Sequence, residues 1–270
     1  MHYLDLADGR QFVRDIASFD TRARQAGIAV IAGASSIPAL SHAVIDTITE
    51  GWRAFHDITV GIFPGNRAPR GLAVVQAILS YVGKPVAVFR QGRWQNIPGW
   101  GLVHRAHVPF VGKRWASVCD TPDQDLLVAR YQPSQSAEFF AGLELPILHL
   151  GLWLLSWPVR WGWLATLLPF ARPMLRIAKW LLPLGSDKGG MTIAVAGLDS
   201  SGQPARAMWA LKADANRGPY VPVLAAVAMA RKFRDGTLTF CGASACVGML
   251  DYRDFQADFG RLAITVTGEG

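Results

Sequence analysis

The stretch IAVIAGASSIPALSHAVID, residues 28–46, decides the fold. Its first part, residues 28–32, is an apolar and β-prone run that is typical of a buried strand. A loop of small residues follows, and Pro38 suits the first turn of a helix because proline has no N–H to leave unpaired. Helical spacing then places three apolar side chains on one face: Leu40, Val44 and Ile48. A strand, a short loop and a helix in this order indicate an α/β protein.

The same order recurs along the chain. Residues 57–63 and 85–90 have strand patterns, and a helical pattern at 72–82 lies between them. We therefore expect a layered α/β sheet that is parallel in this region. Residues 91–143 are richer in Pro, Gly and charge, which predicts irregular segments and short strands. Further on, the sequence predicts a hairpin around DSSGQ (199–203), a helix at 220–233, and late strands at 235–240 and 261–267.

The composition allows a large core and favours anionic partners. Of 270 residues, 51% are hydrophobic, and 27 Lys and Arg stand against 20 Asp and Glu, a net charge of +7. A basic balance suits nucleotide phosphates, an anionic membrane face or nucleic acid. No dense Lys/Arg run occurs, so nucleic acid ranks last and we predict no nucleic-acid partner.

The cysteines and the first residues indicate the cellular compartment. No pair among Cys119, Cys241 and Cys246 has C-x-x-C spacing, and no His lies near Cys241 or Cys246, so we predict no metal site and reduced thiols. The opening residues MHYLDLADGR carry Asp5 and Asp8 and no apolar run, which does not fit a signal peptide. We expect a cytoplasmic protein.

The loop at 33–36 is the first candidate binding site. Helix N-termini expose unpaired N–H groups and a partial positive charge, and Gly33 allows a ligand to approach the backbone. Ser35 and Ser36 add hydroxyl groups. The alternative is a plain connector in which Ser36 only caps the helix. Neither a G-x-G-x-x-G nor a G-x-x-x-x-G-K-[ST] motif occurs in the chain.

The loop PGNRAPRG, residues 64–71, is the second candidate. Arg67 and Arg70 have the fork geometry that grips a phosphate or carboxylate, and Asn66 offers both a donor and an acceptor. Ligands lie outside the carboxyl ends of parallel strands, so this loop and the loop at 33–36 are predicted to face one cleft. The alternative is a surface loop with solvated arginines. No histidine has the spacing of a zincin pair or nucleophile motif, so we assign no catalytic residue, and His42 is only a weak general-base candidate.

Residues 145–184 form a Trp-rich helical segment without an acidic residue. Three alternatives stay open for it: a buried helical pair or dimer face, a helix lying in a membrane interface, and a membrane span. A span is interrupted by Pro158, Arg160 and Pro169. Arg172, Arg176 and Lys179 instead make a basic stripe beside an apolar face, the pattern of an interfacial helix on an anionic membrane surface.

Five motifs, in order, resemble the saccharopine dehydrogenase-like oxidoreductases over nearly the whole chain: HYLDLADGRQFVRDI, AGASSIPALSHAVID, FPGNRAPRGLAVVQAILSYVGKP, GSDKGGM and GPYVPVLAA. The resemblance implies the end of a Rossmann-type parallel sheet at 1–56 and a mixed α/β domain at 57–270. It also implies NADP or NAD as cofactor, hydride transfer on a small-molecule substrate, and membrane association in some relatives.

The resemblance also implies a departure. Family members begin with a strand and a glycine-rich turn that holds the pyrophosphate, and this sequence resembles the portion downstream of that turn, as if truncated. It places six residues beside the nicotinamide and substrate, and none on the adenosine diphosphate: Tyr3, Asp5, Gly33, Ser35, Ser36 and Pro38. We expect an exposed sheet edge and a homo-oligomer. The alternative function is a non-catalytic α/β protein that binds a membrane or a partner.

Overall fold

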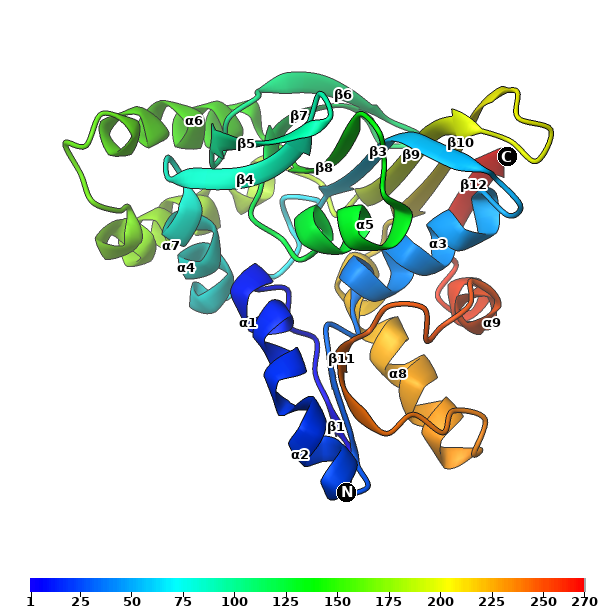
Figure 1. Cartoon of the computed structure of the whole chain (residues 1–270). Helices are drawn as coiled ribbons and strands as arrows, with labels where there is room; N and C mark the ends of the chain where they lie inside the picture. The colour runs from blue at the N-terminus through cyan, green and yellow to red at the C-terminus, as the bar shows by residue number, and fades with distance from the viewer. Residues whose placement is uncertain (270) are drawn as a thin grey trace.

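Two sheets organise the chain in a computed structural model that describes residues 1–269 (Figure 1). The smaller sheet has three parallel strands in the order β1-β2-β11, with bounds Tyr3–Leu4, Ala29–Ala32 and Gly242–Ala245. The residues between β1 and β2 form α1 (Arg10–Asp15), a 3-10 turn η1 (Ile16–Phe19) and α2 (Asp20–Gln25). This sheet thus combines the first residues of the chain with a strand from near its end. The division at residues 56 and 57 stays a prediction.

The larger sheet has nine strands, in the order β12-β10-β9-β3-β8-β4-β5, with the β6–β7 hairpin beside β8. The strands are β3 (Ala54–Phe63), β4 (Pro85–Arg90), β5 (Arg93–Pro98), β6 (His104–Val108), β7 (Gly112–Val118), β8 (Ser136–Ala141), β9 (Gly189–Leu198), β10 (Pro204–Ala213) and β12 (Thr265–Glu269). The other helices are α3 (Ser41–Ile48), α4 (Leu72–Tyr81), α5 (Asp123–Tyr131), α6 (Pro146–Arg160), α7 (Ala171–Trp180), α8 (Val221–Arg234) and α9 (Arg253–Arg261). The mixed α/β fold that the sequence predicts is confirmed.

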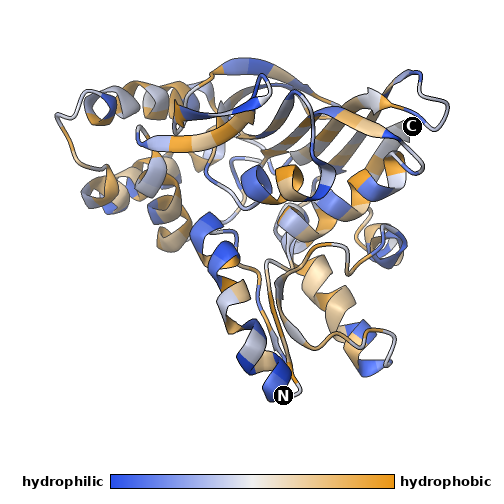
Figure 2. Ribbon diagram, viewed as in Figure 1, coloured by the Kyte–Doolittle hydropathy of each residue, from blue (hydrophilic) through white to orange (hydrophobic). Residues whose placement is uncertain are grey.

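One large core connects the two sheets. One apolar cluster includes side chains of α8 and four fully buried residues: Ile31 on β2, Leu40 just before α3, Val44 on α3, and Ile58 on β3. The predicted apolar face of α3 therefore packs inward. Figure 2 shows apolar residues along strands of the large sheet and along α8 below it. Because this core is shared, the small sheet is held against the large one by apolar burial.

The expectation of a sheet that is parallel at residues 57–90 is confirmed for one pairing of β3 and wrong for the other pairings. Strand β3 pairs in parallel with β8 and antiparallel with β9, and β4 pairs antiparallel with β5. The reason is local for β4. Gln91 and Gly92 both have positive φ, +55° and +70°, which builds a two-residue hairpin turn. The β9–β10 hairpin around DSSGQ is confirmed.

Two helices were not predicted from the sequence. Residues 91–143 contain the helix α5, and α9 lies beyond the predicted strand at 235–240. Residues 235–240 form no strand in the described chain, because the amides of Thr237 and Leu238 donate to the Lys232 carbonyl and close helix α8. Both missed helices have only nine residues, which is shorter than the 11 to 18 residues over which a helical apolar pattern is recognised.

The Trp-rich segment folds into α6, α7 and two 3-10 turns, η3 (Leu168–Phe170) and η4 (Leu182–Leu184). In Figure 1 it forms one end of the molecule. Helix α6 has 15 residues, and at about 1.5 Å per residue it falls short of a hydrocarbon core of about 30 Å. Within residues 1–269, no helix has the length and apolar character needed to cross a bilayer.

Candidate functional site

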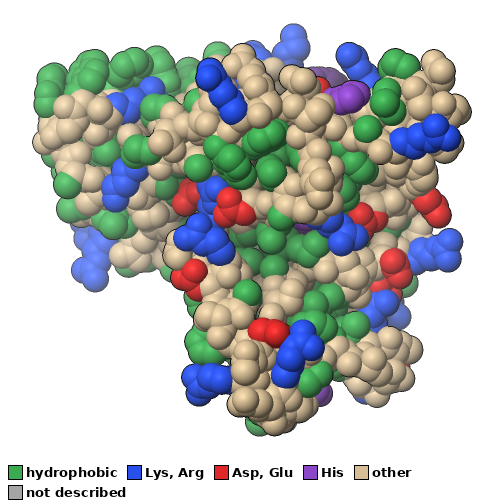
Figure 3. Space-filling model, in the orientation of Figure 1, with side chains coloured by type: hydrophobic (Ala, Val, Ile, Leu, Met, Phe, Trp, Pro, Cys, Tyr) green, Lys and Arg blue, Asp and Glu red, His purple; other side chains and the backbone are tan. Residues whose placement is uncertain are grey.

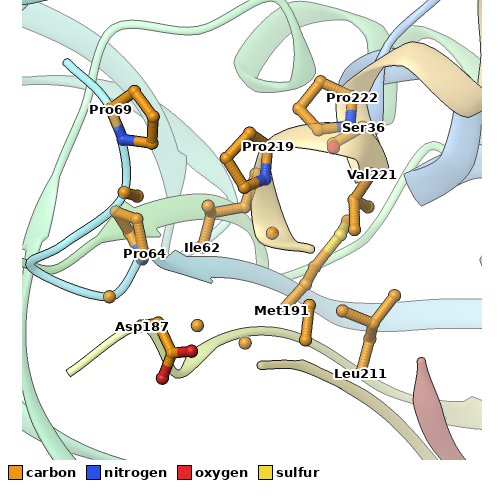
Figure 4. A pocket seen from close by; sticks show the side chains of 16 residues that line it. Ser36, Ile62, Pro64, Pro69, Asp187, Met191, Leu211, Pro219, Val221 and Pro222 are labelled. Atoms are coloured by element: carbon orange, nitrogen blue, oxygen red, sulfur yellow. The ribbon is translucent and has the colours of Figure 1, made fainter. Parts of the chain in front are cut away.

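A pocket of about 200 Å³ lies where the candidate loops meet (Figure 4). Four of the five motifs quoted above contribute to its wall, and Ser36 and Asp187 are its main polar side chains. It is lined by Ser36, Ile62, Pro64, Gly65, Ala68, Pro69, Asp187, Gly189, Gly190, Met191, Leu211, Ala213, Gly218, Pro219, Val221 and Pro222. The predicted meeting of the loops at 33–36 and 64–71 is therefore seen, although β2 and β3 belong to different sheets.

Close backbone packing shapes the pocket wall. A Cβ atom on Gly65 would lie 2.7 Å from the Asp187 carbonyl carbon and 2.8 Å from the Ser186 oxygen. On Gly190 it would lie 2.8 Å from a methyl carbon of Val108. Real Cβ atoms do not approach so closely, so Gly65 lets the loop at 64–71 rest directly on the chain that enters β9, and Gly190 leaves room for Val108.

Glu144 lies outside the pocket and holds its wall through hydrogen bonds. Its carboxylate accepts hydrogen bonds from the amides of Asn66 (2.6 Å) and Ser186 (2.8 Å) and from the Ser186 hydroxyl (2.6 Å). The Arg114 guanidinium lies 3.2 Å from it. Burial opposes the charge of Glu144, but the hydrogen bonds from Ser186 and Asn66, with Arg114, outweigh it and lower its pKa. Glu144 thus stays ionised and holds three distant segments together.

The predicted anion-binding residues of the second loop lie beside the pocket rather than in its wall. Asn66 is fully buried, and its side-chain amide donates to the Leu181 carbonyl at 2.7 Å. Arg67 is exposed and reaches the Pro183 carbonyl at 3.4 Å. Arg70 approaches carbonyl oxygens of Gly65 and Asn66 at 3.3 and 3.4 Å, and burial lowers its pKa. Their role in binding an anion stays a prediction.

The first loop is held by protein groups. The Asp5 carboxylate accepts from the amides of Gly33 (3.0 Å) and Ala7 (2.9 Å), and the Asp5 carbonyl accepts from the Ala34 amide at 2.9 Å. Gly33 has a φ of +76°, and a Cβ there would lie 2.7 Å from the Pro38 ring. Ser35 and Ser36 are buried, and Ser36 borders the pocket.

The capping alternative for this loop is not realised. The turn η2 (Ser36–Leu40) that leads into α3 is not a regular helix, because Ile37 has extended backbone angles (φ −131°, ψ 134°) and the Ile37–Pro38 peptide is cis. Ser35 is its N-cap, and its side chain makes no capping hydrogen bond to the described residues. Tyr3 lies on β1 with 45% of its surface exposed, and the Asp5 carboxylate, as hydrogen-bond acceptor, raises its pKa.

His42 is fully buried on α3, which removes it from contact with a ligand in the pocket. Its Nε2 lies 3.8 Å from a carboxylate oxygen of Asp123, also fully buried, and its ring stacks on Tyr131. Burial, with the charge of Arg130, lowers the pKa of His42 to about 3, and burial raises the pKa of Asp123 to about 7. Both side chains are therefore mostly uncharged between about pH 3 and pH 7.

The comparisons with known proteins concern the fold. No protein-family model and no curated protein sequence matches the chain. Among solved structures, it is similar to apo histidine-tagged saccharopine dehydrogenase (L-Glu forming) from Saccharomyces cerevisiae, with a TM-score of 0.62 and 10% identity. The similarity covers 100% of this chain and 80% of that one. The chain therefore has a distant saccharopine dehydrogenase-like fold.

Sequence reasoning missed several pocket residues. Asp187, Met191 and Leu211 line the pocket, and Glu144 supports it. The motif GSDKGGM, which contains Asp187 and Met191, carried the resemblance and was the available signal. Leu211 and Glu144 carry no local signal, since their position depends on strand register and on contacts between distant segments.

Proposed function

We propose that the protein is an NAD(P)-dependent oxidoreductase of the saccharopine dehydrogenase-like group, acting on a small molecule bound in the pocket. The observation that carries this proposal is the meeting of four motif segments in one pocket, within a dehydrogenase-like fold. A volume of about 200 Å³ is below the roughly 300–1,000 Å³ of sites for drug-sized ligands. It suits a nicotinamide ring or a small substrate rather than a whole dinucleotide.

The first loop fits a ring better than a diphosphate. The amides of Gly33 and Ala34 are engaged by Asp5, and the Ser35 amide donates to the Gly33 carbonyl at 2.8 Å. Few loop amides are left to bind phosphate oxygens. In this proposal Ser36 and the apolar lining hold the nicotinamide and the substrate, and the bound cofactor supplies the hydride chemistry.

A titration of the purified chain with NADPH, followed by nicotinamide fluorescence, tests the proposal. We expect binding weaker than about 1 µM, or about −8 kcal/mol, because the diphosphate has few loop amides to contact. Ala68→Trp places a large ring in the pocket wall and should abolish binding. Ala73→Trp, on the exposed side of α4, is the matched control and should leave it unchanged. No binding at millimolar NADPH, or binding that Ala68→Trp leaves intact, would contradict the proposal.

A non-catalytic protein that attaches to a membrane or a partner is the second candidate. The observation in its favour is the exposed apolar surface of residues 147–184, with side chains such as Trp163 and Trp180 that are 74% and 78% exposed. Cofactor binding in the pocket separates the two functions, since a non-catalytic protein has no use for NADPH.

A further inference from the structure

Half of the large apolar side chains that are exposed in residues 1–268 lie within residues 147–184. We define the α6–α7 surface by Ile147, Leu154, Trp161, Trp163, Phe170 and Trp180, which are 45% to 78% exposed. Figure 3 shows hydrophobic side chains gathered over α6 at the upper left of the molecule. Exposed apolar side chains that gather on one part of a protein mark contact sites for proteins or membranes.

The folding of α6 accounts for the exposure. Ile147 and Leu154 are seven residues apart and share one helix face, while Leu152, Ser156 and Val159 bury another face against the protein. A ladder of Trp rings continues from the helix into the loop beyond it, with centroids 4.9 to 5.8 Å apart between Trp153 and Trp163. The aromatic side chains therefore run from the protein body out to solvent.

The charged side chains of residues 147–184 are all basic. Arg172, Arg176 and Lys179 are exposed on α7, and no ion pair or hydrogen bond to their side chains is formed within residues 1–269. No acidic residue occurs between Glu144 and Asp187. The α6–α7 surface is thus apolar and cationic, which complements a surface that is apolar and anionic.

We propose that the α6–α7 surface docks on an anionic lipid bilayer, with its Trp side chains at the level of the head groups and its cations against lipid phosphates. A second copy of the chain fits less well, because a symmetric contact between two such surfaces brings like charges together. The inference goes beyond the oxidoreductase proposal. Vesicle binding and NADPH titration are separate measurements, so either proposal can fail alone.

Vesicle flotation tests the proposal with the full chain. We expect the protein to float with vesicles of equal parts phosphatidylcholine and phosphatidylglycerol at low salt, and to stay at the bottom with phosphatidylcholine alone. Replacing Arg172, Arg176 and Lys179 together with Gln should lower the partition coefficient about 100-fold, since each basic residue near an anionic surface contributes about 1 kcal/mol, or about a factor of five. About 1 M salt, with a Debye length of about 3 Å, should release the wild-type protein.

A matched control removes the same charge elsewhere. Arg22, Arg206 and Arg253 are exposed and lie on α2, β10 and α9, which Figure 1 shows apart from α6 and α7. Their joint replacement with Gln should leave flotation near the wild-type level. A second variant, Trp163→Ser with Trp180→Ser, should weaken binding even at low salt. The proposal is overturned if the wild-type protein stays at the bottom with anionic vesicles at low salt, or if the two charge variants bind equally. It is also overturned if the surface proves to be a dimer contact that the Trp variant dissolves.

Discussion

The carboxylate of Glu144 accepts a hydrogen bond of 2.6 Å from the backbone amide of Asn66. The two residues are 78 positions apart, and the same carboxylate also holds Ser186. Since Gly65 and Asp187 stand next to these partners and line the pocket, Glu144 fixes the distance between two pocket walls without touching the pocket itself. Asn66 extends the connection to the Leu181 carbonyl, at the end of the Trp-rich segment.

Glu144→Gln should destabilise the protein by about 1–3 kcal/mol, the usual cost of losing hydrogen bonds to a charged group. Because the folded pKa of Glu144 is lowered, its contribution is present above about pH 4.5 and is lost as pH falls through the folded pKa. Urea unfolding at neutral pH and near pH 3 checks this. The difference between wild type and variant should shrink in acid, and an unchanged difference would contradict a charged Glu144.

Gly33→Ala should unfold the first loop locally and cost about 1–3 kcal/mol, because φ is +76° and the new Cβ would lie 2.7 Å from the Pro38 ring. Gly71→Ala is the control, since Gly71 has negative φ and nothing lies within 4 Å of its Cβ position. Urea midpoints should fall for the first variant and stay within experimental error for the second. Equal midpoints would mean that the loop relaxes freely.

Arg10 connects the small sheet to the large one. Its guanidinium pairs with Asp125 and lies 3.1 Å from Asp120, and it donates to the Ala87 carbonyl at 2.8 Å. Arg10→Gln should loosen α1, and amide hydrogen exchange in residues 10–15 should quicken by about tenfold, or about 1.4 kcal/mol. Arg14→Gln, at an exposed position of the same helix, should leave that exchange unchanged.

The sequence pattern predicted the helices and strands that depend only on neighbouring residues. The strand at 85–90 and the β9–β10 hairpin follow from periodicity and turn residues. Strand pairing depends on contacts between distant segments, so no local pattern indicates that β2 and β3 enter different sheets. The same holds for Glu144, whose role needs residues 66, 114 and 186 at once. The roles of Tyr3, Asp5 and the loop arginines in binding stay predictions.

The homo-oligomer stays a prediction, and the N-terminal edge is where we expect its contact. Strand β1 pairs with β2 alone, and Tyr3, Leu6, Phe12 and Phe19 nearby are 42% to 49% exposed. Such an edge favours pairing with another chain. Light scattering should report a dimer or larger species that Tyr3→Lys shifts toward monomer. A monodisperse wild-type monomer without detergent would count against this contact.

Asp123→Asn should stabilise the protein at neutral pH. Burial raises the folded pKa of Asp123 to about 7. Between pH 4 and 7 the unfolded chain therefore releases this proton while the folded chain keeps it, which lowers stability by up to about 1.4 kcal/mol per pH unit. Asparagine carries no proton to lose, so the variant should gain on wild type as pH rises from 4 to 7. If Asp123 instead formed a charged pair with His42, 3.8 Å away, removing its charge would cost about 3–5 kcal/mol.

Urea unfolding at pH 4, 5.5 and 7 distinguishes the two states, with the exposed Asp251→Asn as control. The quantity to compare is the free energy of unfolding of Asp123→Asn minus that of the wild type. If this difference falls as the pH rises from 4 to 7, Asp123 and His42 form an ion pair and the prediction is wrong.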